Sequence, residues 1–371
     1  MEKINKKWLV KIIVLVLVII FVGLAFGMTR PVANKSVKVG VILPLTGAAA
    51  DYGQATKKGI ILAVAKTLKN DNINLEVIYE DSQADPKLAV SAMKKLVNID
   101  KVKYVIGFTS GETLAICSIA DTNKVILLGT ATSPDITTKC GDYTFRNSPS
   151  DTYQGKVLAD KVFAMGYKNV AIFYINNDYG VGLKDKFIKD FEGTITNVES
   201  HKPNDTDFRT QLMKIKANNP EAVVLISHLA EGSIILKQQV ELGLAKPVFS
   251  SESLKDSAVF KLSKLSLERL YISFISQYEG PEFKEYKDSY TKAYGSEFGI
   301  YSDYQYDNIL TIVNALKICK DGSDIECVKK EIYRTNIIGA TGRINFDSNG
   351  DRVDKDYFLY KVQDNTFVPL D

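Results

Sequence analysis

Residues 37–47 read VKVGVILPLTG, an apolar run that ends at a proline and a small polar turn. Such a run, rich in β-branched residues, is typical of a strand. The stretch from Gly53 to Leu68 follows after a short connection, and its apolar residues recur with helical spacing. A strand that leads into a helix is the unit from which parallel sheets with crossover helices are built. The apolar stripe expected on this helix consists of Ile61, Leu62, Val64, Ala65 and Leu68.

The same alternation of strand-like and helix-like segments occurs twice along the chain, with residues 147–151 between the two series. Further strands are expected at 75–79, 104–106, 125–128, 170–174, 195–198, 222–226 and 248, and further helices at 85–98, 113–121, 182–191, 208–217, 231–242, 281–294 and 302–319. Residues 344–368 predict short strands around a turn at 348–350. We therefore predict an α/β protein with two lobes and parallel sheets.

The N-terminus differs from the rest of the chain, because Ile12 to Phe26 is an almost uninterrupted apolar run behind several lysines. Its 15 residues and the small-x-small sequence at 25–27 fit a cleaved signal peptide. The longer window from Trp8 to Met28 has 21 residues with Lys11 as its only charge, which fits a retained membrane anchor equally well. Residues 1–30 therefore predict export and an extracytoplasmic location, periplasmic or at the cell surface.

The composition is that of a globular protein, with 45% hydrophobic and 25% charged residues in a length of 371 that allows about two domains. The net charge of +3 comes from the N-terminus, since residues 31–371 hold 42 basic and 43 acidic side chains. A nucleic-acid partner would need a clustered excess of lysine and arginine. No such partner is expected.

Four cysteines fit an oxidising compartment, where disulfides persist. Cys319 and Cys327 flank a short polar stretch between two helical patterns, and Cys117 and Cys140 flank a strand with its following loop. We expect these two local pairs to form disulfides, and four buried thiols are the alternative. The sequence has no CxxC motif and no Cys/His cluster, so no metal site is expected.

Motifs of catalysis are scarce. The two histidines, His201 and His228, have no GxSxG motif beside them, and no GxxxxGK[ST] phosphate loop occurs. His201 stands in a polar stretch and is predicted to be a surface residue. Gly180 and Gly182 lack the third glycine of a dinucleotide-binding loop, and residues 347–351 predict a hairpin turn rather than a calcium loop. We expect a protein that is not an enzyme and uses no cofactor.

Polar residues follow several predicted strands, at the carboxyl ends where open parallel sheets bind ligands. Ser110 and Thr132 are small hydroxyl residues in loops that precede helices. Such loops combine hydroxyls, backbone amides and a favourable helix dipole, which a free carboxylate needs for binding. The alternative role of both residues is to cap the helices that follow them.

The order of these strand-end sequences resembles the leucine/isoleucine/valine-binding family of type I periplasmic binding proteins. The segment 38–47, followed by Tyr52-Gly53, is similar to the opening strand and loop of that family. Five further blocks follow in the order found in the family: EDSQADP at 80–86, IGFTSG at 106–111, TATSP at 130–134, FRNSPSD at 145–151 and NDYG at 177–180. The match extends over roughly residues 37–365, almost the whole exported chain.

The resemblance implies two Rossmann-like lobes joined by three crossover strands. Lobe 1 is expected at 36–147 plus 276–340, and lobe 2 at 148–275 plus 341–371. It also implies a monomeric transport receptor whose lobes close on an amino acid or similar small molecule and present it to the permease of an ABC transporter. A ligand-sensing subunit for a signalling partner is the alternative function.

Site residues also follow from the resemblance. In the family, the residues matched by Ser110, Ala131 and Thr132 hold the ligand carboxylate, and carbonyl acceptors near Thr130 would complete the site. Glu252 matches the acidic residue that binds the α-ammonium group, and its alternative is an ordinary solvated carboxylate in a loop.

Tyr179 resembles the tyrosine of the second lobe that closes over the ligand. Tyr52, Tyr301 and the segment 227–229 are expected to select the ligand side chain. The family often has an aromatic residue where His228 or Leu229 falls. Because of this departure, small or polar ligands are as plausible as leucine.

Overall fold

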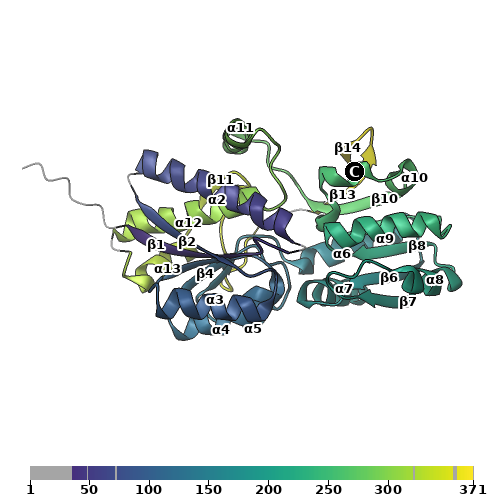
Figure 1. The fold of residues 1–371 in the computed structure, drawn as a ribbon, viewed down its shortest axis with the longest axis horizontal. Helices are drawn as coiled ribbons and strands as arrows, with labels where there is room; N and C mark the ends of the chain where they lie inside the picture. The colour runs from purple at the N-terminus through teal and green to yellow at the C-terminus, as the bar shows by residue number, and fades with distance from the viewer. Residues whose placement is uncertain (1–35, 48, 72, 321, 354–356, 371) are drawn as a thin grey trace, which may run out of the picture. The chain divides into compact units, whose positions relative to one another are not determined.

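The protein is described by a computed structural model that covers residues 36–47, 49–71, 73–320, 322–353 and 357–370. Two α/β arrays occur within these residues (Figure 1). The expected signal peptide or anchor at 1–30 lies outside the described residues. Among the helices that are described, none combines the length and the hydropathy that a membrane crossing requires.

The first sheet has five parallel strands in the order β2-β1-β3-β4-β5. Its strands are β1 (Val37–Leu43), β2 (Leu75–Asp81), β3 (Tyr104–Gly107), β4 (Ile126–Gly129) and β5 (Thr144–Arg146). Its helices are α2 (Ala50–Asp71), α3 (Pro86–Asn98), α4 (Ser110–Thr122), α5 (Ile136–Lys139), α11 (Pro281–Tyr294), α12 (Ser302–Cys319) and α13 (Ile325–Tyr333). Alternate residues of β1 face opposite sides, so that Val41 packs in the core with α2 and α12, and Ile42 packs in the core with α3 and α4.

The second sheet has seven strands in the order β14-β13-β10-β9-β8-β6-β7. Its strands are β6 (Asn169–Ile175), β7 (Thr194–His201), β8 (Ala222–Ile226), β9 (Val248–Ser250), β10 (Leu270–Ile275), β13 (Tyr357–Gln363) and β14 (Thr366–Leu370). Its helices are α6 (Asp151–Ala164), α7 (Asp178–Asp190), α8 (Arg209–Ala217), α9 (Leu229–Glu241) and α10 (Lys264–Leu267), with two short 3-10 turns, η1 (Glu252–Leu254) and η2 (Ser257–Lys261). Strand β13 runs antiparallel to both of its neighbours, and the other pairs are parallel.

The chain passes between the two sheets three times: after β5, after β10 and before β13. The α/β class with parallel sheets is therefore confirmed, with the addition that β13 runs antiparallel within the seven-stranded sheet. A hairpin of β11 (Ile337–Gly339) and β12 (Gly342–Ile344) precedes the third passage. Ile344 and Phe346 pack into the core beneath the five-stranded sheet, although the expected division assigned residues from 341 onward to the second lobe. The lobe boundaries themselves remain a prediction.

The apolar stripe predicted for α2 was wrong in part, because Leu62 and Val64 do pack against the core and the other three residues are exposed. Ile61 and Leu68 are 43% and 51% exposed, whereas the buried face carries Gly59, Ile60 and Ala63. The reason is the close approach of α12, since a Cβ atom on Gly59 would lie 2.2 Å from the backbone oxygen of Ser302. Small residues permit this close approach. The face that carries them is therefore the buried one, although larger apolar residues lie on another face of the helix.

The prediction of His201 as a surface residue was also wrong, because its side chain is only 2% exposed. Strand β7 continues to His201, three residues beyond the expected end, and pairs it with Ile175 of β6. The imidazole lies edge-on to the rings of Phe173 and Phe208, and its Nε2 is 3.0 Å from the Ser227 hydroxyl. The residues next to His201 in the sequence are polar, so the sequence did not indicate that a buried strand ends there.

Both expected disulfides are present. Cys117 of α4 is bonded to Cys140 after α5, with 5.5 Å between their Cα atoms, and Cys319 of α12 is bonded to Cys327 of α13, with 5.9 Å between theirs. Each bond joins two consecutive helices of the five-stranded array.

Replacing either cysteine pair with serine should lower the free energy of unfolding by about 3 kcal/mol, because the cross-link no longer restricts the unfolded chain. The measurement is urea unfolding of the two double variants beside the oxidised wild type. Reduction of the wild type should approach the sum of both losses. An unchanged unfolding midpoint in either variant would contradict a stabilising role for that disulfide.

Candidate ligand-binding site

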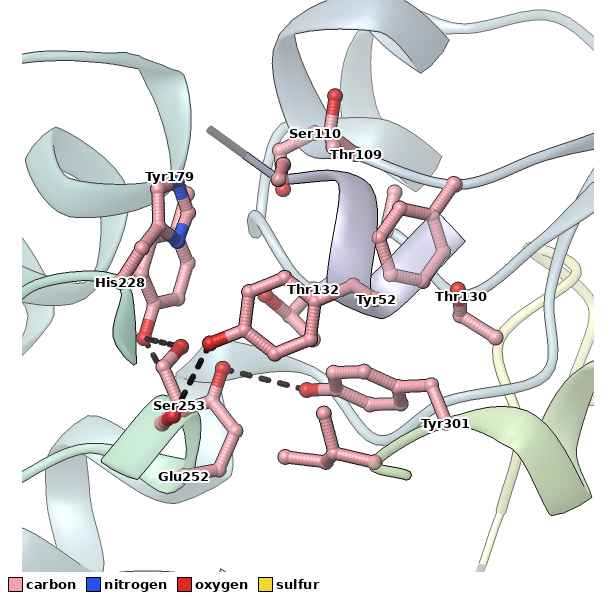
Figure 2. A pocket seen from close by; sticks show the side chains of 14 residues that line it. Tyr52, Thr109, Ser110, Thr130, Thr132, Tyr179, His228, Glu252, Ser253 and Tyr301 are labelled. Carbon is pink, nitrogen blue, oxygen red and sulfur yellow. Dashed lines mark hydrogen bonds between the residues drawn. The ribbon is translucent and has the colours of Figure 1, made fainter. Parts of the chain in front are cut away.

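A pocket lies at the carboxyl ends of strands from both sheets (Figure 2). Loops after β3 and β4 supply one group of its residues, and loops after β6, β8 and β9 supply a second. The beginnings of α2 and α12 complete it, and the cavity volume is about 60 Å³. The lining residues are Ala49, Tyr52, Phe108, Thr109, Ser110, Thr130, Ala131, Thr132, Tyr179, His228, Glu252, Ser253, Ile300 and Tyr301.

The pocket brings together all nine residues that the sequence suggested: Tyr52, Ser110, Thr130, Ala131, Thr132, Tyr179, His228, Glu252 and Tyr301. Their roles toward a ligand remain predictions. The residues that were not expected are Ala49, Phe108, Thr109, Ser253 and Ile300. Phe108 and Thr109 stand inside a block already matched, and Ser253 and Ile300 are sequence neighbours of expected residues. The sequence therefore contained a signal for four of these five.

Hydroxyl groups form one wall of the pocket. The Oγ atom of Ser110 accepts a hydrogen bond from the backbone N–H of Ser133 at 3.1 Å, and Oγ1 of Thr130 accepts one from Gln305 Nε2 at 3.3 Å. Each oxygen is thus used as an acceptor, which leaves its own O–H free to donate. Helix α4 begins at Ser110, where its dipole favours a negative group. This wall suits a carboxylate.

Arg146 supports the same wall from behind, with a side chain that is only 1% exposed. Its Nη1 donates to the backbone oxygens of Thr132 and Ser133, at 2.9 and 2.6 Å. Its Nη2 pairs with the Asp351 carboxylate at 2.6 Å. The guanidinium therefore holds the loop after β4 to the segment before β13.

Glu252 lies in the pocket opposite these hydroxyls, at the start of η1, and is 2% exposed. Its Oε2 accepts a hydrogen bond from Gln154 Nε2 at 2.8 Å and lies 3.1 Å from the Tyr179 hydroxyl. Its Oε1 accepts a hydrogen bond from the Tyr301 hydroxyl at 3.2 Å. Burial raises the pKa of the Glu252 carboxyl, and these hydrogen bonds moderate the increase.

Asp151 is a second acid beside the pocket that the sequence reasoning did not single out. It is fully buried at the first turn of α6, and its backbone N–H donates to Thr132. Burial and the nearby Glu252 raise the pKa of Asp151 well above its ordinary value. Two buried carboxyls this close cannot both ionise readily, so they behave as one coupled pair. The signal was the FRNSPSD block, which ends at Asp151.

Aromatic rings form the rest of the lining. Tyr52 lies between Phe108 and His228, with ring centroids 6.5 and 6.4 Å away. The ring of Tyr301 meets Phe108 edge-on at 6.1 Å, and the imidazole of His228 stacks on Tyr179 at 5.6 Å. These faces offer an apolar surface next to the polar groups.

Hydrogen bonds across the pocket join elements of the two sheets. The Tyr52 hydroxyl, from α2, donates to the backbone oxygen of Ser253 at 3.1 Å and accepts from the backbone N–H of Leu229 at 2.9 Å. Tyr301, from the start of α12, reaches Glu252. The pocket is thus bridged by two tyrosines that belong to the five-stranded array.

Comparison with known proteins agrees with this architecture. The family model described as periplasmic binding protein matches residues 36–366. The Leu/Ile/Val-binding protein homolog 3 of Brucella melitensis is 28% identical over 350 residues, which are 91% of this chain and 95% of that protein. The leucine-, isoleucine-, valine-, threonine-, and alanine-binding protein of Pseudomonas aeruginosa is 26% identical over 340 residues, which are 89% and 90% of the two chains.

Two solved structures are similar over the same extent. The branched-chain amino acid transporter substrate binding protein LivJ of Streptococcus pneumoniae, in complex with isoleucine, has a TM-score of 0.82, 26% identity and coverage of 91% of this chain and 99% of its own. The leucine binding protein LivK of Thermotoga maritima has a TM-score of 0.82, 26% identity and coverage of 90% and 98%. The chain therefore belongs to the periplasmic binding protein family, as a type I member of its branched-chain amino-acid-binding group.

Proposed function

We propose that this protein captures an amino acid or a similar small zwitterion outside the cytoplasm and delivers it to the permease of an ABC transporter. Ser110 and Thr132 bind the ligand carboxylate, and Glu252 binds its ammonium group. Two lobes close around the ligand, and the protein acts as a monomer. We place the last lobe boundary after Phe346, because that residue packs with the five-stranded sheet.

One observation carries the proposal: hydroxyl donors and a buried carboxylate share one small pocket. An α-amino acid carries a carboxylate and an ammonium group on the same carbon atom, so it needs this combination of partners. The buried position of Glu252 strengthens its attraction for an ammonium group, because the local dielectric is low. The disulfides support a location outside the cytoplasm.

A ligand panel tests the function through thermal stability. We expect one or more free amino acids to raise the melting temperature, since a ligand at one hundred times its Kd stabilises the folded state by about 2.7 kcal/mol. The matched 2-keto acids lack the ammonium group and should give no shift, as should the matched amines, which lack the carboxylate. Flat curves for every amino acid would overturn the proposal.

Amino-acid binding should release a proton and weaken as the pH falls. The ammonium group binds the ionised carboxylate, whereas burial raises the pKa of Glu252 in the free protein. Below that raised pKa the ligand must displace a proton, so affinity is highest above it and decreases as the pH falls through it. Titration calorimetry in buffers of different ionisation enthalpy measures the proton released by the coupled Glu252 and Asp151 pair. An affinity that does not decrease toward the acidic end of the range in which the protein stays folded would contradict this linkage.

Changing Tyr52 to phenylalanine should speed ligand release by roughly five- to tenfold, because the variant keeps the ring and loses both hydrogen bonds across the pocket. Stopped-flow dissociation measures the rate. The matched control is Tyr294→Phe, which removes a hydroxyl that donates to the Lys58 backbone oxygen and lies away from the pocket. Equal dissociation rates in wild type and Tyr52→Phe would show that this bridge does not hold the closed form.

A further inference from the structure

The charged residues that line the pocket determine which charge the ligand side chain can carry. Among the lining residues that the structure describes, Glu252 is the one carboxylate, and there is no lysine or arginine. On the proposed function, on which this inference rests, the ligand ammonium group uses Glu252. A charged side chain would then be buried without a counter-charge, which is costly. The ligand side chain is therefore uncharged.

His228 is a polar residue in the aromatic part of the pocket lining, which is left for the ligand side chain. It precedes α9, its imidazole is stacked on the Tyr179 ring with an interplanar angle of 10°, and Tyr52 meets it edge-on (Figure 2). Burial lowers the pKa of His228, so the imidazole is neutral near pH 7. A neutral imidazole carries one N–H donor and one acceptor nitrogen.

The hydrogen-bond network assigns the two nitrogens. Asn177 caps α7 through its Oδ1, which accepts from the backbone N–H of Gly180 at 2.9 Å. Its amide nitrogen therefore faces His228, and Nδ2 of Asn177 lies 3.4 Å from Nε2 of the imidazole. The amide nitrogen is a donor, so Nε2 is the acceptor and the proton is on Nδ1.

No acceptor for that Nδ1–H is found among the residues that the structure describes. The neighbouring hydroxyls are directed at other partners, since Tyr52 donates to Ser253 and accepts from Leu229, and Tyr301 donates to Glu252. An apolar ligand side chain in the closed pocket would leave the Nδ1–H without a partner. A side-chain oxygen would satisfy it.

We propose that His228 makes this site selective for small, uncharged amino acids with a side-chain oxygen, such as threonine or serine, over apolar amino acids of the same size. The imidazole Nδ1–H donates to the side-chain oxygen, while Tyr52 and Phe108 contact the remaining carbon atoms. The cavity of about 60 Å³ agrees with a small side chain. A pocket that is built to hydrogen-bond its ligand rejects an isostere that lacks the polar group much more strongly than an apolar pocket rejects an added hydroxyl.

Threonine and valine provide the decisive comparison, because they have nearly the same shape and differ by one hydroxyl. Titration calorimetry of the full chain should give a Kd for valine at least about tenfold above that for threonine. Serine against alanine is the smaller matched pair and should show the same direction. A valine Kd equal to or below the threonine Kd would overturn the proposal.

Variants separate a role in selectivity from a role in folding. His228→Phe should bring the valine-to-threonine ratio to about one or below, whereas His228→Asn, whose amide can occupy the position of Nδ1, should retain part of the preference. The matched control is Tyr294→Phe, which removes a hydroxyl away from the pocket and should leave the ratio unchanged. A ratio that stays unchanged in folded His228→Phe would also overturn the proposal.

Failure of this inference is distinguishable from failure of the proposed function. If leucine or valine binds and threonine does not, the amino-acid function stands and the assignment of His228 fails. If no amino acid binds the wild type in calorimetry, both fail together. If His228→Phe does not fold, the wild-type ratio and His228→Asn still decide the question.

Discussion

Glu252→Gln should weaken the binding of the preferred amino acid by about a hundredfold or more, with little change in the melting temperature of the free protein. Glutamine has the shape of glutamate and can keep hydrogen bonds with Gln154 and Tyr301, so the pocket should remain assembled. The negative charge that attracts an ammonium group is lost. Since the carboxylate is buried, water does not compensate for that loss.

Titration calorimetry of the variant measures the loss directly. The matched control is Glu241→Gln at the end of α9, which removes an exposed ion pair with Arg209 and should leave the Kd unchanged. Proton release should also be reduced in Glu252→Gln, because one member of the coupled pair is gone. Wild-type affinity in the folded variant would remove Glu252 from the site.

The second large effect is expected on folding. Arg146→Met should lower the free energy of unfolding by about 3–5 kcal/mol, because it leaves Asp351 and the backbone oxygens of Thr132 and Ser133 without their cationic partner. The loop after β4 also loses its support, so amino-acid affinity should decrease in parallel. Urea unfolding and calorimetry measure the two losses.

A matched substitution on the surface provides the control. Lys156→Met removes an exposed ion pair with Asp160 within α6, and it should leave the unfolding midpoint almost unchanged. Arg146→Lys should lie between wild type and Arg146→Met, since lysine keeps the charge and loses the fork geometry. Equal unfolding midpoints for Arg146→Met and Lys156→Met would show that the buried guanidinium contributes no more than a surface charge.

Much of the fold was predictable because most parallel strands of these sheets are short apolar runs followed by a helix, with clear starting residues such as Asp85 before Pro86. The errors arose where tertiary packing overrode the local pattern. Gly59 admits the backbone of α12, so small residues such as Gly59 and Ala63 share the buried face of α2 with Ile60. His201 is drawn inward because β7 extends to pair with the end of β6.

The candidate site was predictable for a topological reason. Residues that end parallel strands emerge at one edge of a sheet, so Ser110 and Thr132 come together although they are distant in sequence. Contacts between the two arrays were harder to predict, because the local sequence does not indicate which loop of one array lies against which loop of the other. Asp151 was therefore missed. Ile300 was missed as well, because it lines the pocket as a residue just before α12.

The two disulfides have a consequence for how the molecule withstands stress. Both clasp helices of the five-stranded array, and the seven-stranded array, which has no cysteine, depends on noncovalent packing alone. Heat should therefore unfold the seven-stranded array first, and with it displace Glu252 and Tyr179. On the proposed function, ligand binding would then be lost at a lower temperature than the structure of the disulfide-bonded array.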